Sequence, residues 1–246
     1  MTAILETRAL VCGFGSRTVL DAGALALEEG GAWTVVGLNG AGKSTLLRTL
    51  CAQIPAISGT AFVRGRDVAA LPSRERAKLV AYLPQQQEVD QSLAVEDLVR
   101  LGRTPYVGRF GNLGARDAAA VESAIELCGL RDIARARLGE ISGGERQRAR
   151  LAMVVAEETP LVLLDEPTTH LDMAQRFALH RLVTELRRER GTAFVTVVHA
   201  VADAERFGDS ILLIEAGRAS CYGPSMRASV RDALVASARI PEEWVY

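Results

Sequence analysis

The chain has 246 residues, of which 48% are hydrophobic and 24% are charged, which is enough to bury one good core or two small ones. Its 29 Lys and Arg residues nearly balance its 30 Asp and Glu residues, and the formal net charge is −1. This balance disfavours nucleic acid binding and a polybasic membrane arm, and the lack of any apolar run of about 18 residues excludes a bilayer-spanning helix.

The N-terminus and the cysteines indicate the compartment. Residues 1–6 lack the basic-then-apolar order of a signal peptide. Cys12, Cys51, Cys128 and Cys221 have no CxxC spacing, and only three histidines occur. We interpret the cysteines as small buried apolar side chains in a reducing compartment, and we expect a soluble cytoplasmic α/β protein.

The N-terminal region is expected to be rich in β-structure. Strands are predicted over Ile4–Val11 and Val19–Leu27, on either side of a turn at Cys12–Ser16. Phe14 lies in this turn, where its ring could stack on a purine or pack into a β core. Its position alone favours the core.

The most specific motif begins at Gly37 and reads G-x-x-x-x-G-K-[ST], the pattern of a phosphate-binding loop. The apolar run Trp33–Val36 predicts a strand before the loop, and Lys43–Ala52 predicts a helix after it. Polyphosphate must approach several backbone N–H groups, and glycine removes the Cβ atoms that would obstruct it. The helix N-terminus adds partial positive charge. The expected nucleotide-binding residues are Gly37, Leu38, Asn39, Gly40, Ala41, Gly42, Lys43, Ser44 and Thr45.

Further elements follow this loop. Strands are expected over Thr60–Val63 and over Val80–Leu83. Between them we expect a helix that begins near Ser73, which could cap it. Gln85 comes just after the second of these strands, where its amide oxygen could reach a metal ion or a water.

From residue 88 to residue 158, β-branched runs give way to Ala, Leu, Arg and Glu at helical spacing, which predicts an inserted helical subdomain. A Ser-Gly-Gly sequence at 142–144 precedes an expected helix that ends near Ala156. Its N–H groups could bind an anion, or its serine could simply cap the helix with Glu145 three residues later. The motif alone favours the cap.

An apolar run over Leu161–Leu164 ends in two acids, Asp165 and Glu166. Continuous apolar runs suit central parallel strands, and open α/β sheets bind ligands at the carboxyl ends of such strands. Asp165 could therefore hold Mg²⁺ through water, and Glu166 could orient or deprotonate a water.

His199 takes the same strand-end position as Glu166, at the end of the next apolar strand. The remaining expected elements are a turn at Thr168–Asp172, a helix over Met173–Arg190, a strand over Thr192–Val198, a hairpin of Ser210–Ile214 and Ala219–Tyr222, and a helical tail from Pro224.

Together these motifs resemble the ATP-binding subunits of ABC transporters over nearly the whole chain. Gly37–Ser44 resembles the Walker A motif, and Leu161–Glu166 the Walker B motif. Ile141–Glu145 resembles the signature usually written LSGGQ, with Ile141 for Leu and Glu145 for Gln. We expect both departures to be tolerated, because the anion site uses a serine and backbone N–H groups.

The shorter motifs also follow the family's order. Gln85 resembles the Q-loop glutamine, Thr169–Asp172 the D-loop, and His199 the switch histidine. Phe14 stands where the family carries an adenine-stacking aromatic, which reverses the preference for the core. Ala200 replaces an Asp that is frequent in the family but is not a phosphate ligand.

The resemblance implies a P-loop NTPase (RecA-like) α/β fold with an N-terminal antiparallel β region and an inserted helical subdomain. It also implies one ATPase domain with a core of residues 1–85 and 159–223, a helical subdomain of residues 86–158 and a tail of residues 224–246. Glu166, His199 and Gln85 are the implied catalytic residues, and Ser44, Gln85 and Asp165 the implied Mg²⁺ site. Two copies would sandwich each ATP, with Ser142, Gly143, Gly144 and Glu145 acting in trans beside Asp172 of the D-loop.

The implied partner is a polytopic membrane permease that docks near Gln85 and the helical subdomain, at the cytoplasmic face of the membrane. An extracytoplasmic binding protein would take part indirectly, and nucleic acid is not expected. Residues 95–106 resemble the LGR-x-P-[YW] stretch of importers for ferric siderophores, haem and cobalamin, and we favour a ferric siderophore. The alternatives are haem or cobalamin import, an exporter subunit, or a soluble ABC ATPase that acts as an assembly factor.

Overall fold

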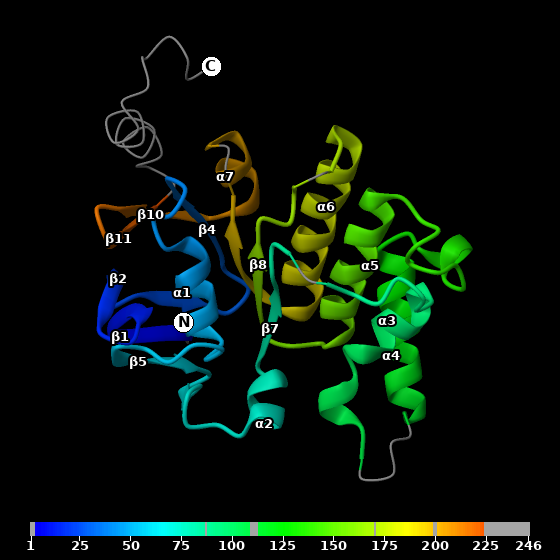
Figure 1. Cartoon of the computed structure of the whole chain (residues 1–246), viewed down its shortest axis with the longest axis horizontal. Coiled ribbons are helices and arrows are strands. Elements are labelled where there is room, and N and C mark those ends of the chain that lie inside the picture. Colours follow the sequence, from blue (N-terminus) through cyan, green and yellow to red (C-terminus); the bar gives the residue numbers. More distant parts are fainter. Residues whose placement is uncertain (1–2, 87, 109–112, 170, 199–200, 224–246) are drawn as a thin grey trace.

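The computed structural model describes residues 3–86, 88–108, 113–169, 171–198 and 201–223. One mixed sheet of eleven strands runs through this part of the chain, with helices on both faces (Figure 1). The strands are β1 (Ala3–Phe14), β2 (Arg17–Gly23), β3 (Ala26–Glu28), β4 (Ala32–Gly37), β5 (Ser58–Val63), β6 (Arg66–Asp67), β7 (Val80–Leu83), β8 (Leu161–Asp165), β9 (Ala193–Val197), β10 (Ser210–Glu215) and β11 (Arg218–Tyr222).

Seven α-helices and two short 3₁₀ turns are present in the described ranges. The helices are α1 (Lys43–Leu50), α2 (Ser73–Ala77), α3 (Val95–Leu101), α4 (Ala115–Leu127), α5 (Gly143–Ala156), α6 (Met173–Arg190) and α7 (Val201–Phe207), and the turns are η1 (Thr104–Tyr106) and η2 (Arg131–Ile133). None of these helices combines the length and apolar character needed to cross a bilayer.

The sheet has a parallel half and an antiparallel half. Its order is β6-β5-β1-β2-β11-β10-β4-β9-β8-β7, with β3 paired to β1 outside this path. Strands β10, β4, β9, β8 and β7 run parallel, whereas β1 pairs antiparallel with β2, β3 and β5. Every residue of β8 and β9 is buried, as expected for central strands that helices cover on both faces.

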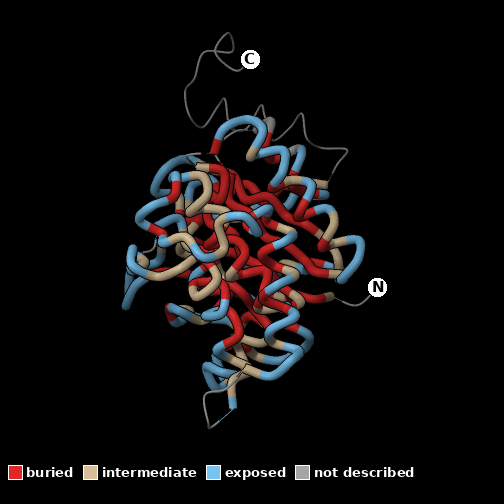
Figure 2. Tube along the Cα trace, turned by 90° about the vertical axis from the view of Figure 1, so that its right-hand side faces the viewer, coloured by how far each residue is buried: buried red, intermediate tan, exposed pale blue. Residues whose placement is uncertain are grey.

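The alternation of side chains along the strands separates two cores. Val162 and Leu164 of β8 face the core that contains α3, α4, α5, α6 and α7. Leu161 and Leu163 face the other core, which contains α1 and the antiparallel strands. Figure 2 shows this buried interior enclosed by exposed turns and helix faces.

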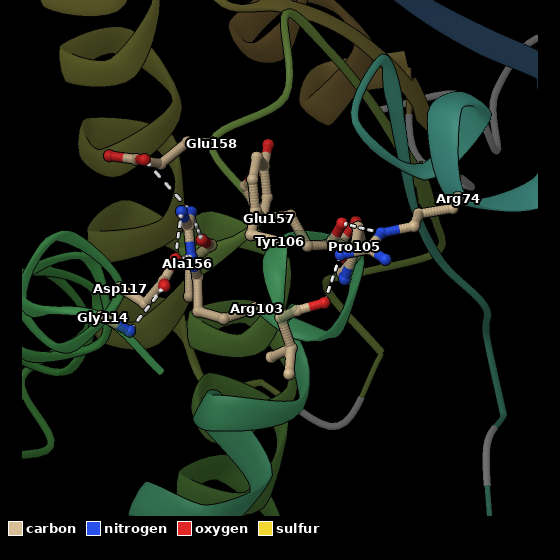
Figure 3. A network of polar contacts seen from close by, with 10 residues as sticks. Arg74, Arg103, Pro105, Tyr106, Gly114, Asp117, Ala156, Glu157 and Glu158 are labelled. Atoms are coloured by element: carbon tan, nitrogen blue, oxygen red, sulfur yellow. Dashed lines mark hydrogen bonds and ion pairs between the residues drawn. The ribbon is translucent and has the colours of Figure 1, made fainter. Parts of the chain in front are cut away.

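The helices α3, α4 and α5, called the helical block below, pack together around a buried arginine (Figure 3). The Arg103 side chain is 1% exposed, and its Nε and Nη2 donate to Asp117 Oδ1 at 3.0 and 2.8 Å. Its Nη1 donates to the carbonyl of Ala156 at 2.7 Å and to Glu158 Oε2 at 3.1 Å. The guanidinium also lies over the Tyr106 ring, 3.9 Å from its centroid. Arg103 therefore joins the ends of all three helices.

A second arginine links the segment between α3 and α4 to an earlier part of the chain. Arg74 of α2 donates through Nε to the carbonyl of Pro105 at 2.8 Å, and through Nη2 to the carbonyl of Val107 (Figure 3). The short helix α2 is thereby held against the turn η1.

The fold class expected from the sequence is confirmed, and four local expectations are wrong. Strand β1 extends through Phe14, because Gly15 at φ 57° allows a two-residue turn. The strand expected over Val19–Leu27 divides at Gly23. Helix α2 begins at Ser73 itself, with Pro72 at the N-cap, and Cys221 is exposed. The helix α7 was not anticipated, and the tail from Pro224 lies outside the described residues.

Candidate active site

The phosphate-loop motif connects the end of β4 to the start of α1, as its sequence predicts. A Cβ atom at Gly37 would lie 2.5 Å from the carbonyl oxygen of Ile214, so only glycine fits there. Gly40 and Gly42 have φ angles of 78° and 104°, which side chains rarely tolerate. The motif therefore folds into a tight loop at the helix N-terminus, where backbone N–H groups can receive an anion.

The Lys43 side chain occupies this loop. It is buried, and its Nζ donates to the carbonyls of Gly37 at 2.8 Å and Leu38 at 3.1 Å. Burial lowers the pKa of Lys43, while the negative charges of Glu166 and Asp165 partly offset this effect. A buried cation held by carbonyl dipoles can exchange them for phosphate oxygens, which carry full charge.

Asp165 ends β8 next to the loop and is 2% exposed. Its Oδ2 accepts from the Tyr82 hydroxyl at 3.2 Å, whereas Oδ1 is buried without a hydrogen-bond partner. Burial raises the pKa of Asp165, and the Ser44 hydroxyl lowers it. A carboxylate oxygen without a partner beside a hydroxyl is a donor set that Mg²⁺ prefers, so these residues fit a magnesium ion.

Glu166 follows directly and is buried. Its backbone lies in the left-handed region at φ 52°, an unfavourable conformation for a residue with a side chain. The Gln85 amide Nε2 donates to Glu166 Oε2 in a short contact. Gln85 and Glu166, which the sequence predicts as site residues, therefore meet at the carboxyl ends of β7 and β8.

Two hollows flank this cluster, each of about 440 Å³. The first, called the Glu166 cavity below, is lined by Gln85, Gln86, Glu88, Val89, Gln91, Gly143, Arg146, Gln147, Arg150, Glu166 and Thr169. The second lies over the phosphate loop and is lined by Val19, Leu38, Asn39, Gly40, Ala41, Ile214, Glu215, Ala216 and Gly217.

The signature residues form a helix cap. The Ser142 hydroxyl donates to Glu145 Oε2 at 2.7 Å, and its N–H donates to the same oxygen at 2.8 Å. These bonds lower the pKa of Glu145. The capping box predicted for this motif is thus present at the start of α5. Within the described residues, no hydrogen bond joins Ser142 or Glu145 to the phosphate loop.

The other predicted site residues are dispersed. Phe14 ends β1 and is 51% exposed, so it is available to a ligand. Asp172 is the N-cap of α6 and accepts from the Gln175 N–H at 2.8 Å. His199 lies outside the described residues.

Sequence reasoning missed two residues of this site. Tyr82 holds Asp165, and its position one residue before the end of a predicted strand was the available signal. Arg150 lines the Glu166 cavity from α5. It lies seven residues after Gly143, which places both on one face of the helix.

A parallel sheet, a phosphate loop before α1 and two acids at the end of a neighbouring strand define a P-loop nucleotide hydrolase. The sequence model of the family described as "ABC transporter" matches residues 20–169. The chain belongs to this family, as an ATP-binding ATPase subunit.

Relatives cover most of the chain. The iron(3+)-hydroxamate import ATP-binding protein FhuC of Bacillus subtilis is 32% identical over 98% of this chain and 90% of that protein. The hemin import ATP-binding protein HmuV of Streptomyces coelicolor is 40% identical over 85% and 74%. The ferric enterobactin transport ATP-binding protein FepC of Escherichia coli is 34% identical over 90% and 82%.

Solved structures share the fold. A nucleotide-free ATP-binding cassette from an ABC transporter superposes with a TM-score of 0.85 at 18% identity, over 98% of this chain and all of that one. A cassette solved as a dimer in a post-hydrolysis state with ADP and Pi gives 0.77 at 21% identity, over 89% and 98%.

Proposed function

We propose that this protein hydrolyses ATP to drive import of an iron chelate of the ferric siderophore type through a membrane permease. The contact of Gln85 with Glu166, next to the phosphate loop, carries the proposal for hydrolysis. The names of the relatives support import of an iron chelate, because FhuC is named for iron(3+)-hydroxamate import and FepC for ferric enterobactin transport. The Arg103–Tyr106 stretch, similar to that of such importers, supports the same assignment.

The chemistry follows from the residues at the loop. Lys43 exchanges its two carbonyl partners for β- and γ-phosphate oxygens, while the loop N–H groups bind the remaining charge. Glu166 takes a proton from the attacking water, and Gln85 fixes the orientation of its carboxylate. Ser44, Gln85 and, through water, Asp165 would hold Mg²⁺, which would supply charge neutralisation of the phosphates when bound.

The second half of each ATP site comes from another copy of the chain in this proposal. Ser142, Gly143, Gly144 and Glu145 would meet the γ-phosphate of the partner, with Asp172 beside them. Ser142 and Glu145 bond to each other and, among the described residues, not to the phosphate loop of their own chain, which supports this arrangement, as does the dimer formed by the related cassette. His199 would contact the γ-phosphate, and Phe14 would stack on adenine.

The permease would dock near Gln85 and the helical block, at the cytoplasmic face of the membrane. We assign the core to residues 1–85 and 159–223, the helical subdomain to residues 86–158, and a C-terminal tail to residues 224–246. An extracytoplasmic binding protein would deliver the chelate.

Haem is the second candidate cargo, because the hemin importer subunit HmuV is 40% identical. Reconstitution with the permease separates the two: we expect a ferric siderophore on its binding protein, rather than haem, to stimulate ATP hydrolysis.

The test of the hydrolytic site is Glu166→Gln. This variant should bind ATP normally and hydrolyse it at least about a hundredfold more slowly, as expected when a general base is lost. Glu88→Gln, which alters another carboxylate of the same cavity, is the matched control and should keep its turnover. Near-normal turnover of Glu166→Gln would contradict the assignment.

A further inference from the structure

Two arginines are buried in the helical block, and their surroundings differ. Arg103 is 1% exposed and is neutralised by Asp117 and Glu158. Arg150, on α5, is 8% exposed, takes part in no ion pair within the described residues, and has an Nε without a hydrogen-bond partner. Burial without a compensating charge lowers the pKa of Arg150. Such a group is costly for folding, and a long apolar side chain would fill the same space.

The partners of Arg150 point to its use. Its Nη2 donates to the carbonyl of Pro84 at 2.6 Å, and its Nη1 donates to Gln147 Oε1 at 2.9 Å. Gln147 is one turn earlier on α5, and its Nε2 donates to the carbonyl of Pro167 at 3.3 Å. We call this pair, Arg150 with Gln147, the α5 bracket.

The bracket holds the two residues adjacent to the Gln85–Glu166 contact. Pro84 immediately precedes Gln85, and Pro167 immediately follows Glu166. Gln85 and Glu166 themselves line the same cavity as Arg150 and Gln147. A movement of α5 is therefore transmitted through two side chains to the backbone on both sides of the hydrolytic pair.

We propose that Arg150 is a positioning residue that fixes the Gln85–Glu166 pair to the signature helix α5. In this role it couples the placement of Ser142, at the start of that helix, to the orientation of Glu166. The inference rests on the proposed function, because it gives Glu166 the role of base.

Arg150→Met separates positioning from stability. Methionine, which is unbranched and apolar, replaces the aliphatic part of the arginine side chain and removes a buried charge that has no ion-pair partner among the described residues, so the melting temperature should hold or rise. The KM for ATP should stay within about twofold, because Arg150 does not touch the phosphate loop. The kcat should fall about tenfold, within the range for a misplaced catalytic group. Arg103→Met is the matched control. It leaves Asp117 without its ion-pair partner and should lower the melting temperature.

Two further variants test whether Arg150 acts through the Pro84 carbonyl on the orientation of Glu166. Arg150→Lys keeps a donor for the Pro84 carbonyl and should recover part of the lost kcat. The effects of Arg150→Met and Gln85→Ala should not add in a double-mutant cycle, because both act on the orientation of Glu166. Additive losses, an unchanged kcat in Arg150→Met, or a fall in melting temperature as large as that of Arg103→Met would overturn the proposal.

The experiments distinguish failure of the proposed function from failure of the α5 bracket. If Glu166→Gln keeps its turnover, the base assignment fails. If Glu166→Gln is inactive and Arg150→Met has full kcat, the bracket alone is overturned.

Discussion

Phe14 is the residue whose exposure carries the most direct functional meaning. A half-exposed phenylalanine at a strand end gains little from the core and presents an open ring face. Phe14→Ala should weaken ATP binding by about 1–2 kcal/mol, or about 5- to 30-fold in Kd, through loss of base stacking. Turnover at saturating ATP should change little. Calorimetric titration measures the affinity.

The matched control for this prediction is Phe177→Ala on α6. Phe177 is 48% exposed, nearly as much as Phe14, but belongs to another element. It should leave ATP affinity unchanged. If Phe14→Ala instead binds ATP normally and melts earlier, the ring belongs to the core.

For individual residues, the sequence predicts those site positions whose geometry depends on neighbouring residues in the chain. The phosphate loop, Asp165 and Glu166 were predictable, because glycine spacing and strand-end acids determine their own geometry. Tyr82 and Arg150 were not, because their roles depend on contacts across 83 and 66 residues of sequence. The capping bond of Asp172 is a different case, because Gln175 lies only three residues away and the sequence contains this cap, although the D-loop interpretation did not include it.

Among the elements, α5 has an unfavourable charge at its C-terminal end. Glu157 is its C-cap residue, where the helix dipole disfavours an anion, and its backbone carbonyl accepts from the Tyr106 hydroxyl at 2.7 Å (Figure 3). Burial raises the pKa of Glu157 from 4.5 to about 8. Between these values the folded state holds a proton that the unfolded state has lost, so this carboxyl lowers stability as pH rises through the window.

Glu157→Gln should therefore stabilise the protein at pH 8 by about 1–2 kcal/mol, less than the full pKa shift because solvent reaches the group. The gain should vanish near pH 4, below both pKa values. Urea denaturation at the two pH values measures it. Glu122→Gln, at an exposed position of α4, is the control and should give no comparable gain. Equal stability of Glu157→Gln and wild type at pH 8 would contradict the prediction.

Element boundaries were predictable in segments with a long hydrophobic periodicity. Their prediction failed where a single turn residue ends the element. The helix Met173–Arg190 matches α6, since its cap and its Gly191 end are both in the sequence. Gly23, at φ 60°, divides one expected strand into β2 and β3, a conformation that hydrophobic alternation does not report. The sheet order, with β4 between β9 and β10, is a tertiary property that no local pattern contains.

At the scale of the whole molecule, the two helix starts that we propose to bind anions lie on different parts of the fold. The phosphate loop opens α1, in one core, and Ser142 opens α5, in the other. If each serves a different ATP in a dimer, Ser142→Arg should spare ATP binding by the isolated subunit. It should abolish hydrolysis, because the bulky arginine side chain would occupy the position of the γ-phosphate.

Mixing this variant with Lys43→Ala tests the shared site. Each mutant homodimer has two damaged sites, whereas the heterodimer collects both lesions in one site and leaves the other intact. Partial ATPase activity should return on mixing, as measured by phosphate release. Full activity of Ser142→Arg alone would contradict a shared site.

One of the four thiols of this chain, that of Cys221, is a natural attachment point for spectroscopic probes. Cys12, Cys51 and Cys128 are buried, and burial raises the pKa of Cys51 to about 11 and of Cys128 to about 12, so these thiols stay protonated and shielded from maleimides. Cys221 is exposed on β11, in the same sheet as the strand that precedes the phosphate loop. A dye or nitroxide pair on Cys221 of two copies would report their separation during turnover, without a cysteine-free background.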